Sequence, residues 1–133
     1  MKRDALLEIL KTHAVKFQMT GSRYICNPAP TDTDEDYVAL AAGRLADALA
    51  QSGFEMNTNP ELYEGLPDFY AWRCGEFNVI QTNNPVFFAR FVAATEAAKA
   101  MNLQSKADRI AIFQAVLYGN IHNEKDSLQW LAA

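Results

Sequence analysis

The sequence predicts an α+β fold, with a small mixed sheet flanked by helices and two helices at the C-terminal end. Three observations support this class. Apolar residues recur at helical spacing in several long segments, short apolar runs of strand length lie between them, and Gly or Pro separates most of these segments. They follow in the order helix, strand, turn, strand, helix, short strand, two-strand hairpin, two helices, and we expect one domain over 1–133.

The N-terminal half is predicted to supply two helices and three strands. The first helix is amphipathic, and the strand after it is short and ends at a Gly-Ser turn. A loop containing two prolines then leads into an apolar strand, and Gly53 closes the helix that follows. In chain order we expect a helix over 4–17, strands over 17–20 and 36–40, a helix over 41–52 and a short strand over 54–56.

The C-terminal half has clearer boundary signals. Asn84 is a typical helix-capping residue and Pro85 suits the first helical position. Ser105 is a second capping residue, and Gly119 follows the last apolar residue of its helix as a stop signal. We expect a loop over 57–67, strands over 68–73 and 77–82 joined by a tight hairpin, helices over 85–101 and 106–118, and a short helical piece within 120–133.

Composition excludes several classes of protein. The net charge of −4 provides no basic field, so a nucleic-acid partner is not favoured. No apolar run approaches the roughly 18 residues of a membrane-spanning helix, and polar residues interrupt the N-terminal segment where a signal-peptide core would lie. The two cysteines lack zinc-ligand spacing. We therefore expect a cytoplasmic protein with free thiols and no membrane association.

Alternating aspartates mark the entry to the second strand. Asp32, Asp34 and Asp36 precede an apolar run, and residues two apart on a strand share a face. Asp34 and Asp36 would therefore lie close together and repel each other unless a cation sits between them. Mg²⁺, or Mn²⁺ in its place, suits a pair of carboxylates that also meets substrate phosphates. The alternative is a solvated acidic turn without a ligand.

A Gly-Ser pair stands upstream of these aspartates. Gly21 lets the backbone approach a phosphate closely, and a helical turn after it would direct N–H groups at that phosphate. Any Gly-Ser pair can also be a simple turn. The order of the two features, first Gly21-Ser22 and then Asp34 and Asp36, favours a nucleotide site over two unrelated turns.

The stretch that holds both features is GSRYICNPAPTDTDEDYVAL, residues 21–40. It resembles the signature of the nucleotidyltransferase superfamily, the polymerase-beta-like fold, in which Gly-Ser precedes Ser/Thr-Asp-x-Asp at the start of an apolar strand. The later part of the chain is similar to small phage-encoded members, which would place the protein in a host cytoplasm. The resemblance implies a minimal nucleotidyltransferase-like fold, with Gly21 and Ser22 on the nucleotide phosphates and Asp34 and Asp36 on Mg²⁺. The implied reaction moves a nucleotidyl group from an NTP to a hydroxyl acceptor that the resemblance does not identify.

The chain departs from this family at the third carboxylate. Active members usually carry it on a later strand, where this sequence has Asn78. Glu76 would share a face with Asn78 if the strand begins there, and Asp32 is a further candidate. Two functions therefore stay open: a Mg²⁺-dependent nucleotidyltransferase, or a catalytically degenerate module that binds a nucleotide or inhibits a host factor. A third reading is a plain α+β domain with an incidental acidic loop.

Four basic residues are candidates for phosphate contacts. Arg offers a planar fork that matches phosphate oxygens, and Arg23 stands directly beside Gly21-Ser22. Arg73 belongs to the predicted hairpin, and Lys106 and Arg109 belong to the last long helix. The alternative for each of the last three is a solvated position on the surface.

Overall fold

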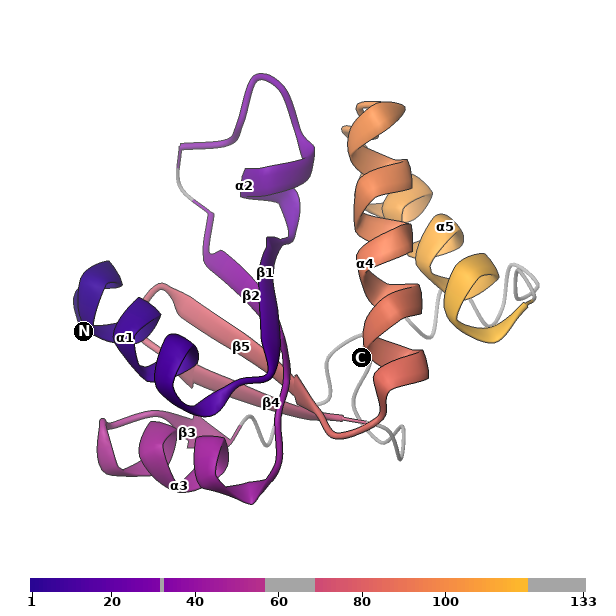
Figure 1. The fold of residues 1–133 in the computed structure, drawn as a ribbon. Helices are drawn as coiled ribbons and strands as arrows, with labels where there is room; N and C mark the ends of the chain where they lie inside the picture. The colour runs from indigo at the N-terminus through magenta and orange to yellow at the C-terminus, as the bar shows by residue number, and fades with distance from the viewer. Residues whose placement is uncertain (32, 57–68, 120–133) are drawn as a thin grey trace.

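The structure is a computed structural model that describes residues 1–31, 33–56 and 69–119 (Figure 1). Asp32, the predicted loop over 57–67 and the predicted helical piece within 120–133 lie outside the described residues. The helices are α1 (Arg3–His13), α2 (Ser22–Ile25), α3 (Gly43–Gln51), α4 (Pro85–Ala100) and α5 (Lys106–Tyr118), and the strands are β1 (Lys16–Thr20), β2 (Glu35–Leu40), β3 (Glu55–Met56), β4 (Tyr70–Cys74) and β5 (Phe77–Thr82).

The strands form one five-stranded sheet in the order β1-β2-β5-β4-β3. β2 and β5 run parallel in its centre, and every other neighbouring pair is antiparallel. The parallel register places Asp36 opposite Asn78. The sheet is therefore mixed, and the predicted α+β class with two C-terminal helices is confirmed.

Helices cover the two faces of the sheet separately. α1 and α3 lie on one face, while α4 and α5 lie on the other together with the short α2 (Figure 1). Alternation along β2 follows from this arrangement, because Tyr37 and Ala39 belong to the core under α1 and α3 whereas Val38 belongs to the core under α4. Asp36 shares the α4 face with Val38, and Glu35 shares the opposite face with Tyr37.

The predicted caps of the two C-terminal helices are confirmed. Asn84 Oδ1 accepts hydrogen bonds from the backbone N–H groups of Val86 and Phe87, at 2.9 and 3.3 Å. Ser105 caps α5, and Gly119 ends it with a φ of 76°, in the left-handed region where glycine carries no penalty. Each capping residue lies within a few residues of the helix end that it sets, so these helix ends can be predicted from the sequence.

The largest differences from the predicted helices are the end of α1 and one additional short helix. α1 ends at His13 rather than at Phe17, because Ala14 is already extended and Val15 begins to pair with the sheet by donating to Leu40 O. Phe17 fits the apolar spacing of the helix and also that of a strand, and the pairing with β2 decides for the strand. In addition, the residues after Gly21 form the one-turn helix α2, where the sequence indicated only a turn.

Candidate functional site

Asp34, Asp36 and Asn78 converge on the α4 face of the sheet. Asn78 Nδ2 donates to Asp36 Oδ1 at 2.8 Å and to Asp34 Oδ2 at 3.1 Å. The parallel pairing of β2 with β5 sets this geometry, since it brings Asn78 level with Asp36. Asp34 lies just before β2 rather than within it, and its carboxylate still turns to the same side. One amide group thus bridges two carboxylates.

The Asp36 carboxylate is electrostatically unfavourable in this setting. Burial raises its pKa to about 6, the hydrogen bond from Asn78 opposes this rise, and the negative charge of Asp34 adds to it. The positive charges of Arg23 and Arg73 lower the pKa of Asp36 by smaller amounts. A cation beside the two carboxylates would relieve both the burial and the repulsion.

Gly21 packs directly on this carboxylate. Its φ is 76°, which side chains rarely allow, and a Cβ built there would clash with Asp36 Oδ2 and lie 2.8 Å from Asp36 Cγ. The position therefore requires glycine for two independent reasons. The structure brings the Gly21-Ser22 loop and the aspartates together although Gly21 and Asp36 are 15 positions apart in the sequence.

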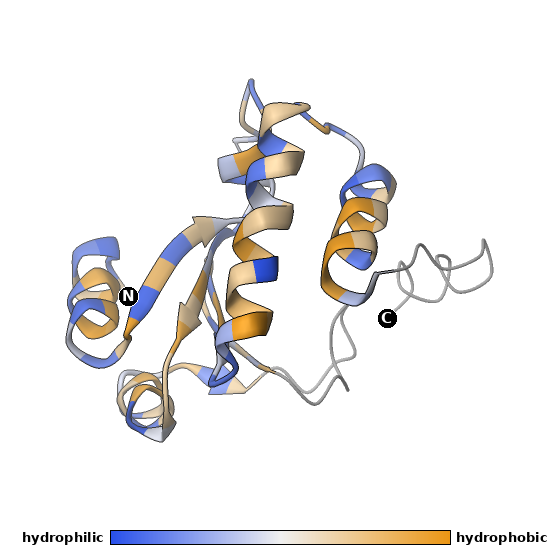
Figure 2. Cartoon of the chain, turned by 45° about the vertical axis from the view of Figure 1, so that its right-hand side comes forward, coloured by the Kyte–Doolittle hydropathy of each residue, from blue (hydrophilic) through white to orange (hydrophobic). Residues whose placement is uncertain are grey.

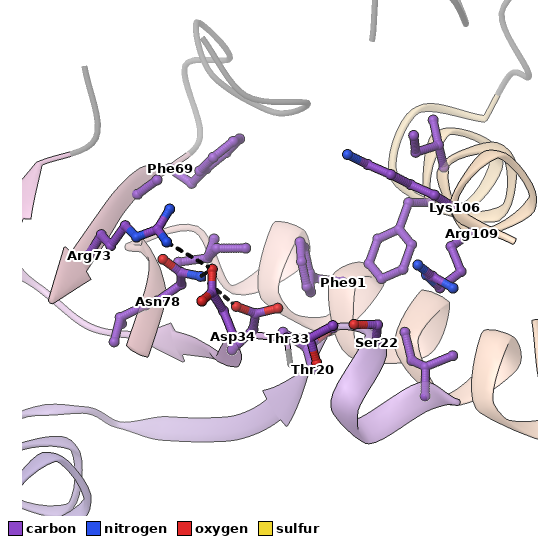
Figure 3. A pocket seen from close by; sticks show the side chains of 18 of the residues that line it. Thr20, Ser22, Thr33, Asp34, Phe69, Arg73, Asn78, Phe91, Lys106 and Arg109 are labelled. Carbon is purple, nitrogen blue, oxygen red and sulfur yellow. Dashed lines mark hydrogen bonds and ion pairs between the residues drawn. The ribbon is translucent and has the colours of Figure 1, made fainter. Parts of the chain in front are cut away.

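These residues line a cavity of about 670 Å³ between the sheet and helices α2, α4 and α5 (Figure 3). Its polar side holds Thr20, Ser22 and Thr33 besides the aspartates and Asn78. The volume falls in the range of small-molecule sites, and an apolar wall with a few convergent polar groups is typical of them. The apolar wall is formed by Ile25, Phe69, Ile80, Phe91, Ile110 and Phe113.

Three of the four predicted basic residues line the same cavity. Arg73 Nη2 lies 3.3 Å from Asp34 Oδ2, and Lys106 reaches from α5 toward that side of the cavity (Figure 3). Arg109 also lines the cavity, but its Nη1 donates to Leu103 O at 3.0 Å and to Gln104 O at 2.8 Å. Arg109 thereby holds the connection between α4 and α5, a role that sequence analysis did not indicate.

Arg23 and Glu76 do not line this cavity. Arg23 Nη1 lies 3.6 Å from Glu35 Oε1 and 4.0 Å from Glu76 Oε2. Adjacency to Gly21-Ser22 was a poor guide, because successive residues of a helical turn point about 100° apart. Glu76 belongs to the turn before β5, which begins at Phe77, so the condition for sharing a face with Asn78 is not met.

Glu35 is a charged residue that sequence analysis missed. Its side chain is 1% exposed and accepts hydrogen bonds from Arg3, with Nη2 at 2.6 Å and Nε at 2.9 Å, and from the Tyr37 hydroxyl at 2.7 Å. The bond from Arg3 holds the pKa of Glu35 below its usual value. A signal was present, since strand alternation turns Glu35 toward the core face, where a carboxylate needs a partner.

The donor set suits a hard cation only in part. Carboxylate and amide oxygens are ligands that Mg²⁺ accepts, and Asp34, Asp36 and Asn78 supply three such groups. As assigned, Asn78 turns its NH₂ toward the carboxylates; reversing the amide would turn its oxygen there instead. Among the described residues, no cluster of three or more Asp, Glu, His or Cys side chains is arranged to hold a metal.

None of the family models, curated proteins and solved structures with which the chain was compared matches it. Within residues 1–31, 33–56 and 69–119, no helix is long and apolar enough to cross a membrane.

Proposed function

We propose that this protein is a nucleotidyltransferase-like domain that binds a nucleoside triphosphate with Mg²⁺ and transfers its nucleotidyl group to a hydroxyl acceptor. The observation that carries the proposal is the convergence of Asp34, Asp36 and Asn78 against Gly21, inside one cavity with three basic side chains. A solvated acidic turn would not leave Asp36 half-buried or require a glycine packed against it.

Asp34, Asp36 and Asn78 are the groups that would hold the metal, with the Asn78 amide reversed so that its oxygen faces the ion. When bound, Mg²⁺ would polarise the phosphoryl group and neutralise charge on the departing pyrophosphate. The buried Asp36 carboxylate stays charged more readily beside a cation, so metal binding lowers its pKa and releases a proton at weakly acidic pH.

Basic side chains around the cavity suit the triphosphate. Lys106 makes no ion pair with any described residue and reaches into the cavity from the side opposite the aspartates (Figure 3). Arg73 pairs with Asp34 and is half-exposed, so its guanidinium is free to turn to a phosphate once a metal has taken its place. The apolar wall beneath α4 and α5 offers Phe91 and Phe113 as a surface for the base.

Asn78 supports a second candidate function. An amide cannot accept a proton from an attacking hydroxyl, and Glu76 points away from the cavity toward Arg23. A domain with this site would bind the nucleotide without turning it over and act as a binding or inhibitory module. The two functions share the site and differ only in catalysis.

The site itself is tested by calorimetric titration with each of the four NTPs, with and without Mg²⁺. We expect Mg²⁺-dependent binding that Asp34→Asn/Asp36→Asn abolishes. The matched control, Asp4→Asn/Asp47→Asn, removes two exposed carboxylates elsewhere and should leave binding unchanged. Absence of NTP binding under every metal condition would refute both candidate functions.

Catalysis is tested separately with α-labelled NTP and a panel of hydroxyl acceptors. Label transfer by the wild-type protein supports the transferase. If the wild type binds NTP but only Asn78→Asp transfers label, the natural protein is the binding module and the third carboxylate is what it lacks. Asn78→Asp should also bind Mn²⁺ more tightly than the wild type, because it adds a third charge within about 3 Å of the other two carboxylates.

A further inference from the structure

A second cavity, of about 720 Å³, lies at the β1 edge of the sheet. It is bounded by β1, by the first turns of α4 and by the end of α1. We call it the edge groove. The edge groove is lined by Lys11, Ala14, Val15, Lys16, Phe17, Gln18, Leu40, Pro85, Phe88, Ala89 and Val92.

One side of the edge groove is an open strand. β1 stands at the end of the strand order and pairs with β2 on its inner side, and no strand among the described residues pairs with its outer side. Its five residues contain no proline and span roughly 17 Å. A strand of this kind presents unpaired backbone groups to any extended chain that approaches it.

Most of the residues that line the edge groove are apolar, and several of them are accessible. Val15 is 75% exposed, Ala89 is exposed, and Val92 and Leu40 are half-buried. At its far end, Gln18 Nε2 donates to Glu96 at 2.7 Å, and this bond ties β1 to α4. In Figure 2 most of α4 has hydrophobic colours. An apolar face beside an open edge favours side chains at alternate positions of an added strand.

Among the described residues, the charged side chains that line the edge groove are Lys11 and Lys16, in a chain with a net charge of −4. Neither lysine forms an ion pair with another described residue. This local positive charge decides the occupant. A second copy of the chain would bring the same two lysines into a groove that is already positive, whereas an acidic segment would be attracted.

We propose that the edge groove binds an extended segment of a partner protein that alternates apolar and acidic residues, and that this segment adds to β1 as a sixth strand. The backbone of β1 supplies hydrogen bonds, the face of Ala89 and Val92 takes the apolar side chains, and Lys11 and Lys16 pair with the acidic ones. This interaction does not involve the nucleotide site and does not depend on the function proposed for it.

The test starts from a random library of ten-residue peptides selected against the purified wild-type protein, followed by fluorescence anisotropy on the enriched peptides. We expect sequences in which apolar residues alternate with Asp or Glu. Methylating alternate backbone nitrogens of such a peptide should abolish binding in one register and spare it in the other, because only one set of N–H groups faces β1.

Three variants locate the binding surface. Ala89→Arg fills the groove from an exposed helix position and should abolish binding, while Lys11→Glu/Lys16→Glu should weaken it roughly tenfold or more. Lys2→Glu/Arg44→Glu makes the same charge change at two exposed residues outside both cavities. This control variant should bind the peptide about as tightly as the wild type. Thermal unfolding of each variant establishes that it is folded.

Several results would overturn the proposal. Failure to enrich any peptide, enrichment of basic peptides, or equal binding to Ala89→Arg would each rule out an acidic strand in this groove. Sedimentation that shows a wild-type dimer dissociated by Ala89→Arg would assign the groove to a second copy instead.

Discussion

Glu35 and Asp36 are neighbours on β2, yet their carboxylates lie on opposite faces of the sheet in contrasting surroundings. Glu35 receives hydrogen bonds from Arg3 and Tyr37 and has a lowered pKa. Asp36 receives one from Asn78, faces the charge of Asp34, and has a pKa raised to about 6. Glu35 is buried and Asp36 is half-buried. Burial is the largest cause of the raised pKa of Asp36, whereas at Glu35 the hydrogen bond from Arg3 outweighs the effect of burial.

This difference separates a structural carboxylate from a binding one. The fold itself provides the cation for Glu35, which therefore joins α1 to β2 in a closed arrangement. The fold compensates the charge of the Asp36 carboxylate only in part. Carboxylates with an unfavourable charge of this kind are typical of sites where a ligand supplies the missing positive charge. The comparison predicts that Glu35 stabilises the fold and, under the proposed function, that Asp36 serves binding. Substitution tests each prediction.

The largest expected effect belongs to Glu35→Gln. The amide turns one NH₂ toward the donors of Arg3, so we expect a loss of about 2–4 kcal/mol in the free energy of unfolding at pH 7, measured with urea. The loss should shrink as pH falls through the lowered pKa of Glu35, because a protonated Glu35 no longer pairs with Arg3. Glu76→Gln, at an exposed carboxylate 4.0 Å from Arg23, is the control and should change stability by less than about 0.5 kcal/mol.

Asp36→Asn should act in the opposite direction. Because the pKa of Asp36 is raised to about 6 on folding, the folded state holds a proton more tightly than the unfolded chain. Stability therefore falls as pH rises from about 4 to about 6, and the full cost of the charged carboxylate remains above that range. We expect the variant to be about 1–2 kcal/mol more stable than wild type at pH 7 and to lose this advantage below about pH 4. A destabilised Asp36→Asn at pH 7 would place Asp36 with Glu35 as a structural residue.

The smallest effect on stability is expected for Arg73→Gln. Its ion pair with Asp34 is exposed on both sides, so unfolding should change by less than about 0.5 kcal/mol. Removing this internal cation should nevertheless raise the affinity for Mn²⁺ alone a few-fold and lower the affinity for Mg²⁺-NTP, both measured by calorimetry. Arg44→Gln, at an exposed site on α3, is the control. Equal shifts in the two affinities would exclude an exchange of Arg73 between Asp34 and phosphate.

Local signals were sufficient for much of the fold and for part of the site. Asn84, Ser105 and Gly119 act on their own helix ends. The spacing of Asp34 and Asp36 predicted that their carboxylates lie on one side, and they do, although Asp34 precedes β2. The remaining features depend on contacts between distant segments. Pairing with β2 decides where α1 stops, and Glu35 acquires its partner from a residue 32 positions away.

The direction of a side chain within a short helical turn also could not be predicted from the sequence. Arg23 follows Gly21-Ser22 directly, but one residue of helical rotation carries its guanidinium to Glu35 and away from the cavity. Lys106 and Arg109 lie far along the chain and still line the cavity, because α5 packs against α4 above the sheet. Closeness in sequence therefore did not predict which basic residues line the cavity: the near one does not, and the two distant ones do.

The contact between Gly21 and Asp36 also has a genetic consequence. Every missense change of a glycine codon adds a Cβ, and at this position that atom collides with a carboxylate on a backbone already at positive φ. The codon should therefore tolerate only synonymous changes in a saturation screen that reads nucleotide binding. The codon of Gly53, which is also at positive φ but has no atom within 4 Å of a built Cβ, should tolerate Asn and other residues suited to that conformation.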